Sequence, residues 1–119
     1  MLTPVRIGSY RMCGFKIGKG CSIGMKCYFD DLCVDKIVIG NNVTISYGVY
    51  FACHGRKQAH NKIIIKDGAY IGMRTSITAR HDIEIGEGAI IGAMALVNKS
   101  VSAGATAVGV PCRVIDKGC

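Results

Sequence analysis

Side chains that could perform chemistry are concentrated in three short segments of the sequence. Residues 52–62 are polar and basic and contain two of the three histidines, His54 and His60. Residues 30–35 contain three aspartates, and residues 80–82 read Arg-His-Asp. Histidines and carboxylates are the groups that most often move protons and hold polar substrates. These segments are therefore the candidate active-site elements, and they can act together only if the fold brings them to one place.

A repeat of six residues predicts the elements that position these segments. Large hydrophobic residues recur at this interval and glycine follows many of them, while a small or β-branched residue stands four positions after most of them. These anchor residues form four sets of three: Ile17, Ile23 and Phe29; Ile39, Ile45 and Phe51; Ile65, Ile71 and Ile77; Ile85, Ile91 and Val97. Three hexapeptides make a triangular coil of about 18 residues, with one short strand on each side. The repeat predicts an all-β fold, a left-handed parallel β-helix of about four to five coils with loop excursions, in a single domain over residues 1–119.

The three polar segments are the places where the repeat is interrupted. The spacing between anchors is four residues too long after Phe29, eight too long after Phe51 and two too long after Ile77. Stacked coils lie about 4.8 Å apart, so equivalent interruptions approach one another. We therefore expect Asp31, His54 and His81 to lie along one edge of the prism.

Some residues of these segments have a simpler interpretation. For Asp35, His60, His81 and Asp82 we favour the role of a solvated loop residue. Cys53 could act as a covalent nucleophile beside His54, but a lone cysteine is usually unreactive.

Composition excludes several other classes of protein. The net charge of +7 fits an anionic partner such as a phosphorylated cofactor, but the basic residues are scattered without interleaved aromatics, so we expect no nucleic acid partner. No apolar run reaches the roughly 18 residues of a membrane span and no secretory segment opens the chain, so we expect no membrane partner and a cytoplasmic location.

The seven cysteines include no C-x-x-C pair, and Cys21, Cys27 and Cys33 fall at small interior positions of the repeat. This placement predicts reduced core residues rather than disulfides or a structural zinc site.

Besides the repeat, two stretches of the sequence resemble segments of a known protein family. Residues 39–49, followed shortly by His54, are similar to the segment that leads to the catalytic histidine of the hexapeptide-repeat acyltransferases, especially the maltose, galactoside and polysaccharide O-acetyltransferases. The ending at residues 108–115 closely matches the tail of the sugar acetyltransferases. The resemblance covers roughly residues 15–115. It implies an acetyl-CoA-dependent acetyltransferase that moves an acetyl group to a hydroxyl of a sugar or polysaccharide precursor, in a homotrimer with its site between subunits.

The resemblance also implies roles for particular residues. His54 matches the general base, and Asp31 matches a carboxylate that helps to hold the acceptor, with Asp30 as the alternative. Met73 and Ala93 match positions along the pantetheine arm of the cofactor. Asn98 and Lys99 match a pair near the far end of CoA, and Arg113 matches a residue that meets its phosphates. Acetyl-CoA is expected as cosubstrate, and no metal is expected.

Two other functions remain open on the same fold. A γ-type carbonic anhydrase-like metal hydratase needs three histidines around zinc at a subunit interface, and His54, His60 and His81 supply that number. Their surroundings do not resemble that family, in which the histidines lie within the hexapeptides. The other alternative is a non-catalytic hexapeptide scaffold that only assembles.

Overall fold

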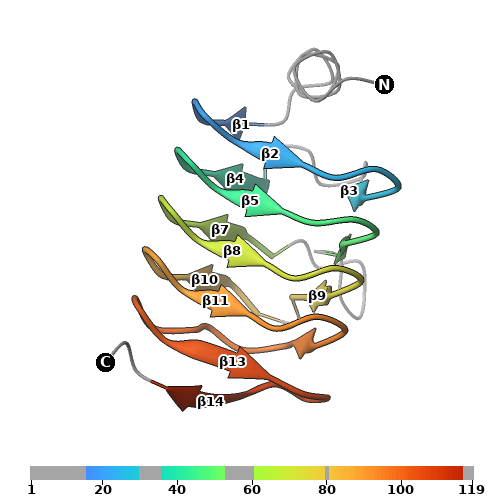
Figure 1. Cartoon of the computed structure of the whole chain (residues 1–119), viewed down its shortest axis with the longest axis vertical. Helices are drawn as coiled ribbons and strands as arrows, with labels where there is room; N and C mark the ends of the chain where they lie inside the picture. Colours follow the sequence, from blue (N-terminus) through green and yellow to red (C-terminus); the bar gives the residue numbers. More distant parts are fainter. Residues whose placement is uncertain (1–15, 30–35, 53–60, 80, 117–119) are drawn as a thin grey trace.

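The backbone of the computed structural model winds into stacked three-strand coils (Figure 1), and it describes residues 16–29, 36–52, 61–79 and 81–116. The first coil contains β1 (Lys16–Ile17), β2 (Ser22–Ile23) and β3 (Tyr28–Phe29), and the second contains β4 (Ile37–Ile39), β5 (Thr44–Ile45) and β6 (Tyr50–Ala52). The third contains β7 (Ile63–Ile65), β8 (Tyr70–Ile71) and β9 (Ser76–Thr78), and the fourth contains β10 (Ile83–Ile85), β11 (Ile90–Ile91) and β12 (Leu96–Val97). The chain continues through β13 (Thr106–Val108) and β14 (Arg113–Asp116).

Equivalent strands of successive coils pair into three sheets. Sheet A has the order β1-β4-β7-β10, sheet B has β2-β5-β8-β11-β13-β14, and sheet C has β3-β6-β9-β12. Pairing is parallel and in register, for example Ile39 with Ile65, and only β14 runs antiparallel to its neighbour β13. The predicted left-handed parallel β-helix is confirmed. Four complete coils and a partial fifth lie within the described residues, at the lower end of the four to five expected.

The interior is built from the residues that set the repeat. From Ile23 to Val97, each anchor side chain described by the structure is at most 2 % exposed. The small residue four positions after an anchor fills the remaining interior space of its coil. At three of these positions a polar side chain forms a hydrogen bond to a backbone carbonyl of the next coil. Cys21 Sγ donates to Gly40 O at 3.1 Å, Cys27 Sγ to Ser46 O at 3.2 Å and Thr75 Oγ1 to Gly92 O at 3.1 Å. Cys21 is buried in the core and Cys27 packs against it partly buried, at the interior positions predicted for them, whereas Cys33 lies outside the described residues.

Glycine follows the anchors because the next coil passes too close for a side chain. A Cβ atom on Gly72 would lie 2.6 Å from the backbone nitrogen of Ala93, and one on Gly24 would lie 2.6 Å from that of Tyr47. Such contacts with backbone atoms cannot be relieved by a rotamer change. The glycine thus lets consecutive coils stack directly at the corners that follow sheets A and B.

Candidate functional site

The three corners of the prism carry different side chains. We name them by the sheets that they join: the AB corner, the BC corner and the CA corner. All three interruptions of the repeat leave the coil at the CA corner, between a strand of sheet C and the next strand of sheet A. The described strands before and after each interruption thus meet at one edge, as the spacing of the anchors predicts.

The described parts of the CA corner show how the longest interruption is attached to the next coil. Ala79 donates its backbone N–H to Ala52 O at 2.9 Å, and Asn61 Nδ2 donates to Ala79 O at 2.8 Å. Lys62 donates its N–H to Asp82 Oδ1 at 2.8 Å. The residues on either side of positions 53–60 are therefore both fixed to the edge of the third coil.

The predicted acid–base residues are only partly described at this corner. His81 lies there, exposed, next to Asp82. His54, His60, Asp30, Asp31 and Asp35 lie outside the described residues, so their predicted roles remain predictions.

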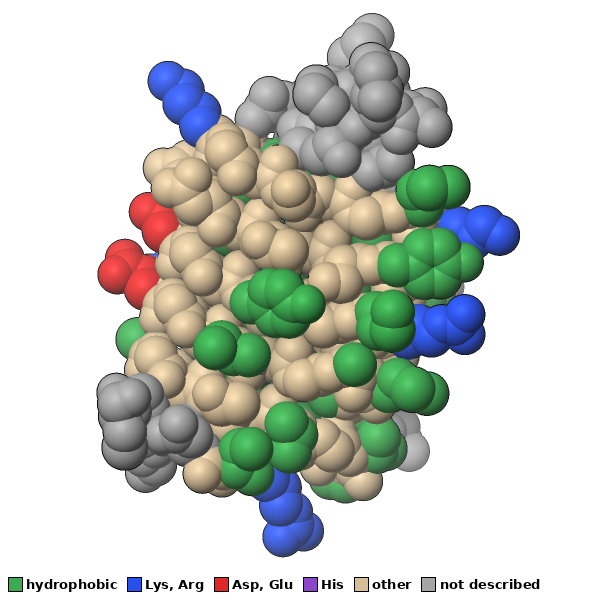
Figure 2. Space-filling view, in the orientation of Figure 1, with side chains coloured by type: hydrophobic (Ala, Val, Ile, Leu, Met, Phe, Trp, Pro, Cys, Tyr) green, Lys and Arg blue, Asp and Glu red, His purple; other side chains and the backbone are tan. Residues whose placement is uncertain are grey.

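The BC corner carries a column of exposed hydrophobic residues from successive coils. Met25 is 52 % exposed, Tyr47 36 %, Met73 48 % and Met94 65 %. Figure 2 shows hydrophobic side chains gathered along this edge, with Lys and Arg side chains beside them and acidic side chains on the opposite edge. Met94 donates its N–H to Met73 O at 2.8 Å, so Met73 and Ala93, which the resemblance assigns to the pantetheine arm, lie on adjacent coils of one edge.

A hollow of about 290 Å³ lies at the C-terminal end of the prism. Its lining includes Lys99 and Arg113, the two cations assigned to the far end of CoA, together with Val101, Ala107, Cys112 and Val114. Asn98 is partly buried beside Lys99 but does not line the hollow. The structure thus brings Lys99 and Arg113 together, and it places Met73 and Ala93 on a different corner.

Strand β12 connects these two groups of residues. It runs from the BC corner, just after Ala93, to the CA corner, just before Asn98 and Lys99. Lys99 is six positions after Ala93, a distance that an extended chain spans in roughly 20 Å. Ala93 therefore lies before this strand of the last complete coil and Asn98 and Lys99 lie after it, while Met73 lies on the preceding coil and Arg113 begins β14.

The C-terminal stretch shapes the hollow because it caps the last coil. Leu96 donates its N–H to Gly109 O at 3.0 Å, and Cys112 donates its N–H to Leu96 O at 2.8 Å. The segment thereby covers the free edge of sheet C, and β14 covers the free edge of sheet B. The specific tail noticed in the sequence has a structural role as a cap, and it carries Arg113 into the wall of the hollow.

Burial raises the pKa of the Cys112 thiol. Because only the thiolate is nucleophilic, we expect iodoacetamide to label Cys112 slowly at pH 7, at a rate that still rises with pH above the ordinary thiol range near 9. Tryptic peptides resolve this residue from buried Cys21, which should react more slowly still, and mass spectrometry of timed samples measures both. Fast labelling of Cys112 with a plateau below pH 8 would contradict this expectation.

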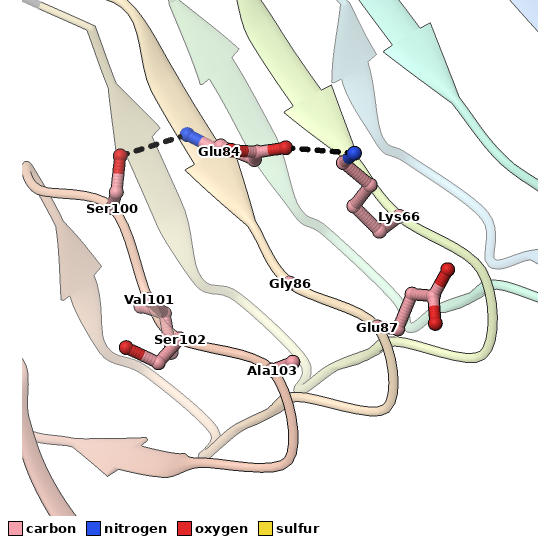
Figure 3. A pocket seen from close by; sticks show the side chains of 8 residues that line it. All are labelled: Lys66, Glu84, Gly86, Glu87, Ser100, Val101, Ser102 and Ala103. Carbon is pink, nitrogen blue, oxygen red and sulfur yellow. Dashed lines mark hydrogen bonds and ion pairs between the residues drawn. The ribbon is translucent and has the colours of Figure 1, made fainter.

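A hollow of about 430 Å³, which was not predicted from the sequence, lies on sheet A (Figure 3). Lys66 Nζ forms an ion pair with Glu84 Oε1 at 2.9 Å, and Ser100 Oγ accepts the backbone N–H of Glu84 at 3.0 Å. The hydrogen bond that Lys66 donates to the Glu84 carboxylate and the charge of Glu84, followed by the charges of Glu87 and Asp67, raise the pKa of Lys66. Both members of the pair are about half exposed, so solvent screens their attraction. The one sequence signal was Lys66, which stands where most coils have a glycine.

Two further properties concern the described residues alone. In that part of the chain no three His, Cys, Asp or Glu side chains are grouped so that they could hold a metal ion. No helix in the same residues is long and apolar enough to cross a membrane.

The three-sheet prism, its hexapeptide repeat and the glycine corners define a hexapeptide-repeat β-helix. The chain shares this fold with solved acetyltransferases, and the resemblance found in the sequence is confirmed. A maltose O-acetyltransferase from Clostridium difficile 630 is 29 % identical, with a TM-score of 0.73 over 94 % of this chain and 74 % of that one. A hexapeptide-repeat-containing acetyltransferase from Vibrio cholerae matches with a TM-score of 0.79 at 19 % identity, over 100 % of this chain and 82 % of that one.

A soybean serine acetyltransferase complexed with serine is 33 % identical, with a TM-score of 0.67 over 84 % of this chain and 40 % of that one. The chain therefore spans less than half the length of this relative. No family model and no curated protein matches the sequence. The solved neighbours support acetyl transfer as the general activity.

Proposed function

We propose that the chain is an acetyl-CoA-dependent O-acetyltransferase, a single β-helix domain that works as a homotrimer on a hydroxyl of a sugar or polysaccharide precursor. His54 is the general base and Asp31 holds the acceptor. Met73, Ala93, Asn98, Lys99 and Arg113 bind the cofactor.

The observation that carries the proposal is the pair of cations around the terminal hollow. Lys99 follows β12 and Arg113 begins β14, and both side chains line the same space of about 290 Å³. Phosphate groups form charge-assisted hydrogen bonds with such cations, and guanidinium can bind two phosphate oxygens at once. The net charge of +7 favours the approach of an anionic cofactor over long range.

The BC corner supplies a matching surface for the uncharged part of the cofactor. Met73 and Ala93 lie on adjacent coils, and exposed Met94 stands beside them. This surface is apolar, and it offers backbone groups because the corners are built from glycine and small residues. A pantetheine arm, which alternates amides with short alkyl chains, fits such a surface.

In the proposed reaction, the imidazole of His54 accepts the proton of the acceptor hydroxyl. The hydroxyl oxygen forms a bond to the thioester carbonyl carbon, and the carbonyl oxygen becomes an oxyanion that needs hydrogen-bond donors. The carbon–sulfur bond then breaks, the acetyl ester remains on the acceptor, and the CoA thiolate takes the proton from His54. Asp31 orients the acceptor through hydrogen bonds to its other hydroxyls.

The test is the release of free CoA thiol from acetyl-CoA in the presence of a panel of sugars, amines and serine. The proposal predicts release that depends on the acceptor and is fastest with a sugar. Release only with amines would show N-acetylation, and release with no acceptor on the panel would contradict acetyl transfer to these groups.

Removing one cation should weaken cofactor binding specifically. Arg113→Ala is expected to raise the KM for acetyl-CoA about tenfold, because a charge-assisted hydrogen bond contributes about 1.5–3 kcal/mol. The KM for the acceptor should not change. The matched control is Lys16→Ala, which removes an exposed cation at the first coil and should leave both constants unchanged. An equal effect of both substitutions would mean that net charge alone attracts the cofactor.

A further inference from the structure

Sheet A ends earlier along the prism than sheet B. Its last strand is β10, whereas sheet B continues through β13 and β14. Residues 99–102, which we call the wall segment, occupy the place of a further strand of sheet A. They form a single parallel bridge with β10, between Val101 and Ile85. The path of the wall segment therefore depends on a small number of contacts with β10.

The wall segment lies between two hollows. One is the hollow of about 430 Å³ on sheet A, which we call the outer hollow, and the other is the terminal hollow of about 290 Å³. Ser100 and Val101 line both of them. Lys99 lines the terminal hollow alone, and Ser102 lines the outer hollow alone. A change in the path of the wall segment would therefore reshape the space that contains Lys99 and Arg113.

The register of the repeat shows that Lys99 departs from the pattern of sheet A. Counting back from the pair of Val101 and Ile85, Lys99 is equivalent to Ile83, which pairs in turn with Ile63. Both of these isoleucines are buried, at 1 % and 0 % exposed, whereas Lys99 is exposed. The chain therefore leaves the path of a regular strand at Lys99, and the ammonium group stays outside the core.

The side chain of Ser100 makes this departure possible. Glu84 donates its backbone N–H to Ser100 Oγ at 3.0 Å (Figure 3). In a regular parallel pair continued from Val101, this N–H would bind the carbonyl of Lys99. The Ser100 hydroxyl takes the place of that carbonyl, so the N–H of Glu84 is satisfied while Lys99 turns away from β10.

The backbone of Val101 completes the attachment of the wall segment. Val101 donates its N–H to Glu84 O at 2.9 Å and accepts the N–H of Gly86 at 2.8 Å. These two bonds fix the chain at Val101. The Ser100 bond acts one residue closer to Lys99, so it restrains the backbone of Lys99 more directly.

We propose that Ser100 is a positioning residue of the cofactor site. Its hydroxyl holds the wall segment to β10 through the N–H of Glu84, and this bond keeps the Lys99 ammonium in the hollow that Arg113 also lines. Ser100 therefore acts on the cofactor phosphates through Lys99. This inference rests on the proposed binding of acetyl-CoA in the terminal hollow, and it gives a role to a residue that the resemblance did not assign.

Kinetics of three variants test this role. Ser100→Ala is expected to raise the KM for acetyl-CoA about fivefold, the effect of one hydrogen bond, and to leave kcat unchanged. Ser100→Thr keeps a hydroxyl at the same carbon and should stay within about twofold of the unmodified protein. Ser102→Ala is the matched control, because it removes the same group from the same segment on the side of the outer hollow. It should change neither constant.

A double-mutant cycle separates positioning from a purely structural effect. Lys99→Ala should raise the KM for acetyl-CoA about tenfold. If Ser100 acts through Lys99, adding Ser100→Ala to Lys99→Ala should cause no further rise, because coupled residues are not additive. A further fivefold rise in the double variant would overturn the proposal, and so would an unchanged KM in Ser100→Ala alone.

Binding experiments separate this inference from the proposed activity. Calorimetric titration uses CoA, which carries the phosphates, and pantetheine, which lacks them. Ser100→Ala should weaken the binding of CoA about fivefold and leave the binding of pantetheine unchanged. If CoA binding depends on Ser100 in this way and no acceptor is acetylated, the positioning role stands and the transfer reaction is wrong. If thiol release and CoA binding are the same in Ser100→Ala as in the unmodified protein, acetyl transfer stands and the positioning role is wrong.

Discussion

Replacing His54 with alanine should lower kcat by at least 100-fold. A positioned general base contributes about 10²–10⁴ to the rate, and in the proposed reaction no other group takes the proton of the acceptor hydroxyl. The substitution falls in an interruption of the repeat and not at an anchor position, so the unfolding midpoint and the KM for acetyl-CoA should remain unchanged. Steady-state thiol release, with unfolding followed by circular dichroism, measures all three quantities.

His81→Ala is the matched control for this substitution. His81 is an exposed histidine at the CA corner, two residues after Ala79, whose carbonyl accepts a hydrogen bond from Asn61. It should retain nearly full activity. Full activity of His54→Ala, or an equal loss in the two variants, would remove His54 from the role of specific base.

Replacing Gly86 with alanine should destabilise the fold by about 3 kcal/mol, at the upper end of what overpacking usually costs. A Cβ atom at Gly86 would lie 2.3 Å from the backbone nitrogen of Ala103 and 2.6 Å from its Cα atom. The obstacle is backbone, so only a separation of the last two turns can relieve the contact. That separation would also disturb Val101, which pairs with Ile85 and lines the terminal hollow.

Gly88→Ala is the matched control, two residues away in the same corner. Gly88 has a φ of +66°, but nothing lies within 4 Å of the position that a Cβ atom would take. The substitution should therefore lower the free energy of unfolding only by the cost of placing alanine in the left-handed conformation, about 1 kcal/mol. Asn42 adopts this conformation at the same corner of the second coil, and Lys26, Arg74 and Met94 adopt it at the BC corner. Urea unfolding at matched protein concentration measures both variants, and equal destabilisation would mean that the contact between coils does not determine the requirement for glycine.

The fold could be predicted from the sequence because one physical requirement recurs. An interior of isoleucine and small residues repeats every six residues, and within the described residues the AB and BC corners carry a glycine or another residue with a positive φ. Ile39, Ile65 and Ile85 could therefore be recognised as equivalent positions of successive coils, although interruptions of different lengths separate them. The placement of all three interruptions on one edge followed from the same spacing.

The outer surface could not be predicted in the same way, because no core requirement constrains it. Tyr28 and Tyr50 are outward residues of two coils whose rings stack on each other, and their contact depends on how the interruption between them restores the register. The ion pair of Lys66 with Glu84 depends likewise on side-chain directions across sheet A. The approach of Lys99 to Arg113 needs the antiparallel return of β14, which the hexapeptide spacing does not encode.

Calorimetric titration with acetyl-CoA tests the central claim most directly, since every proposed role requires a thioester held by the last coils. We predict saturable binding of one cofactor per chain below millimolar concentration, weakened about tenfold by Arg113→Ala. No detectable binding at millimolar cofactor would contradict the account and would favour a β-helix that only assembles.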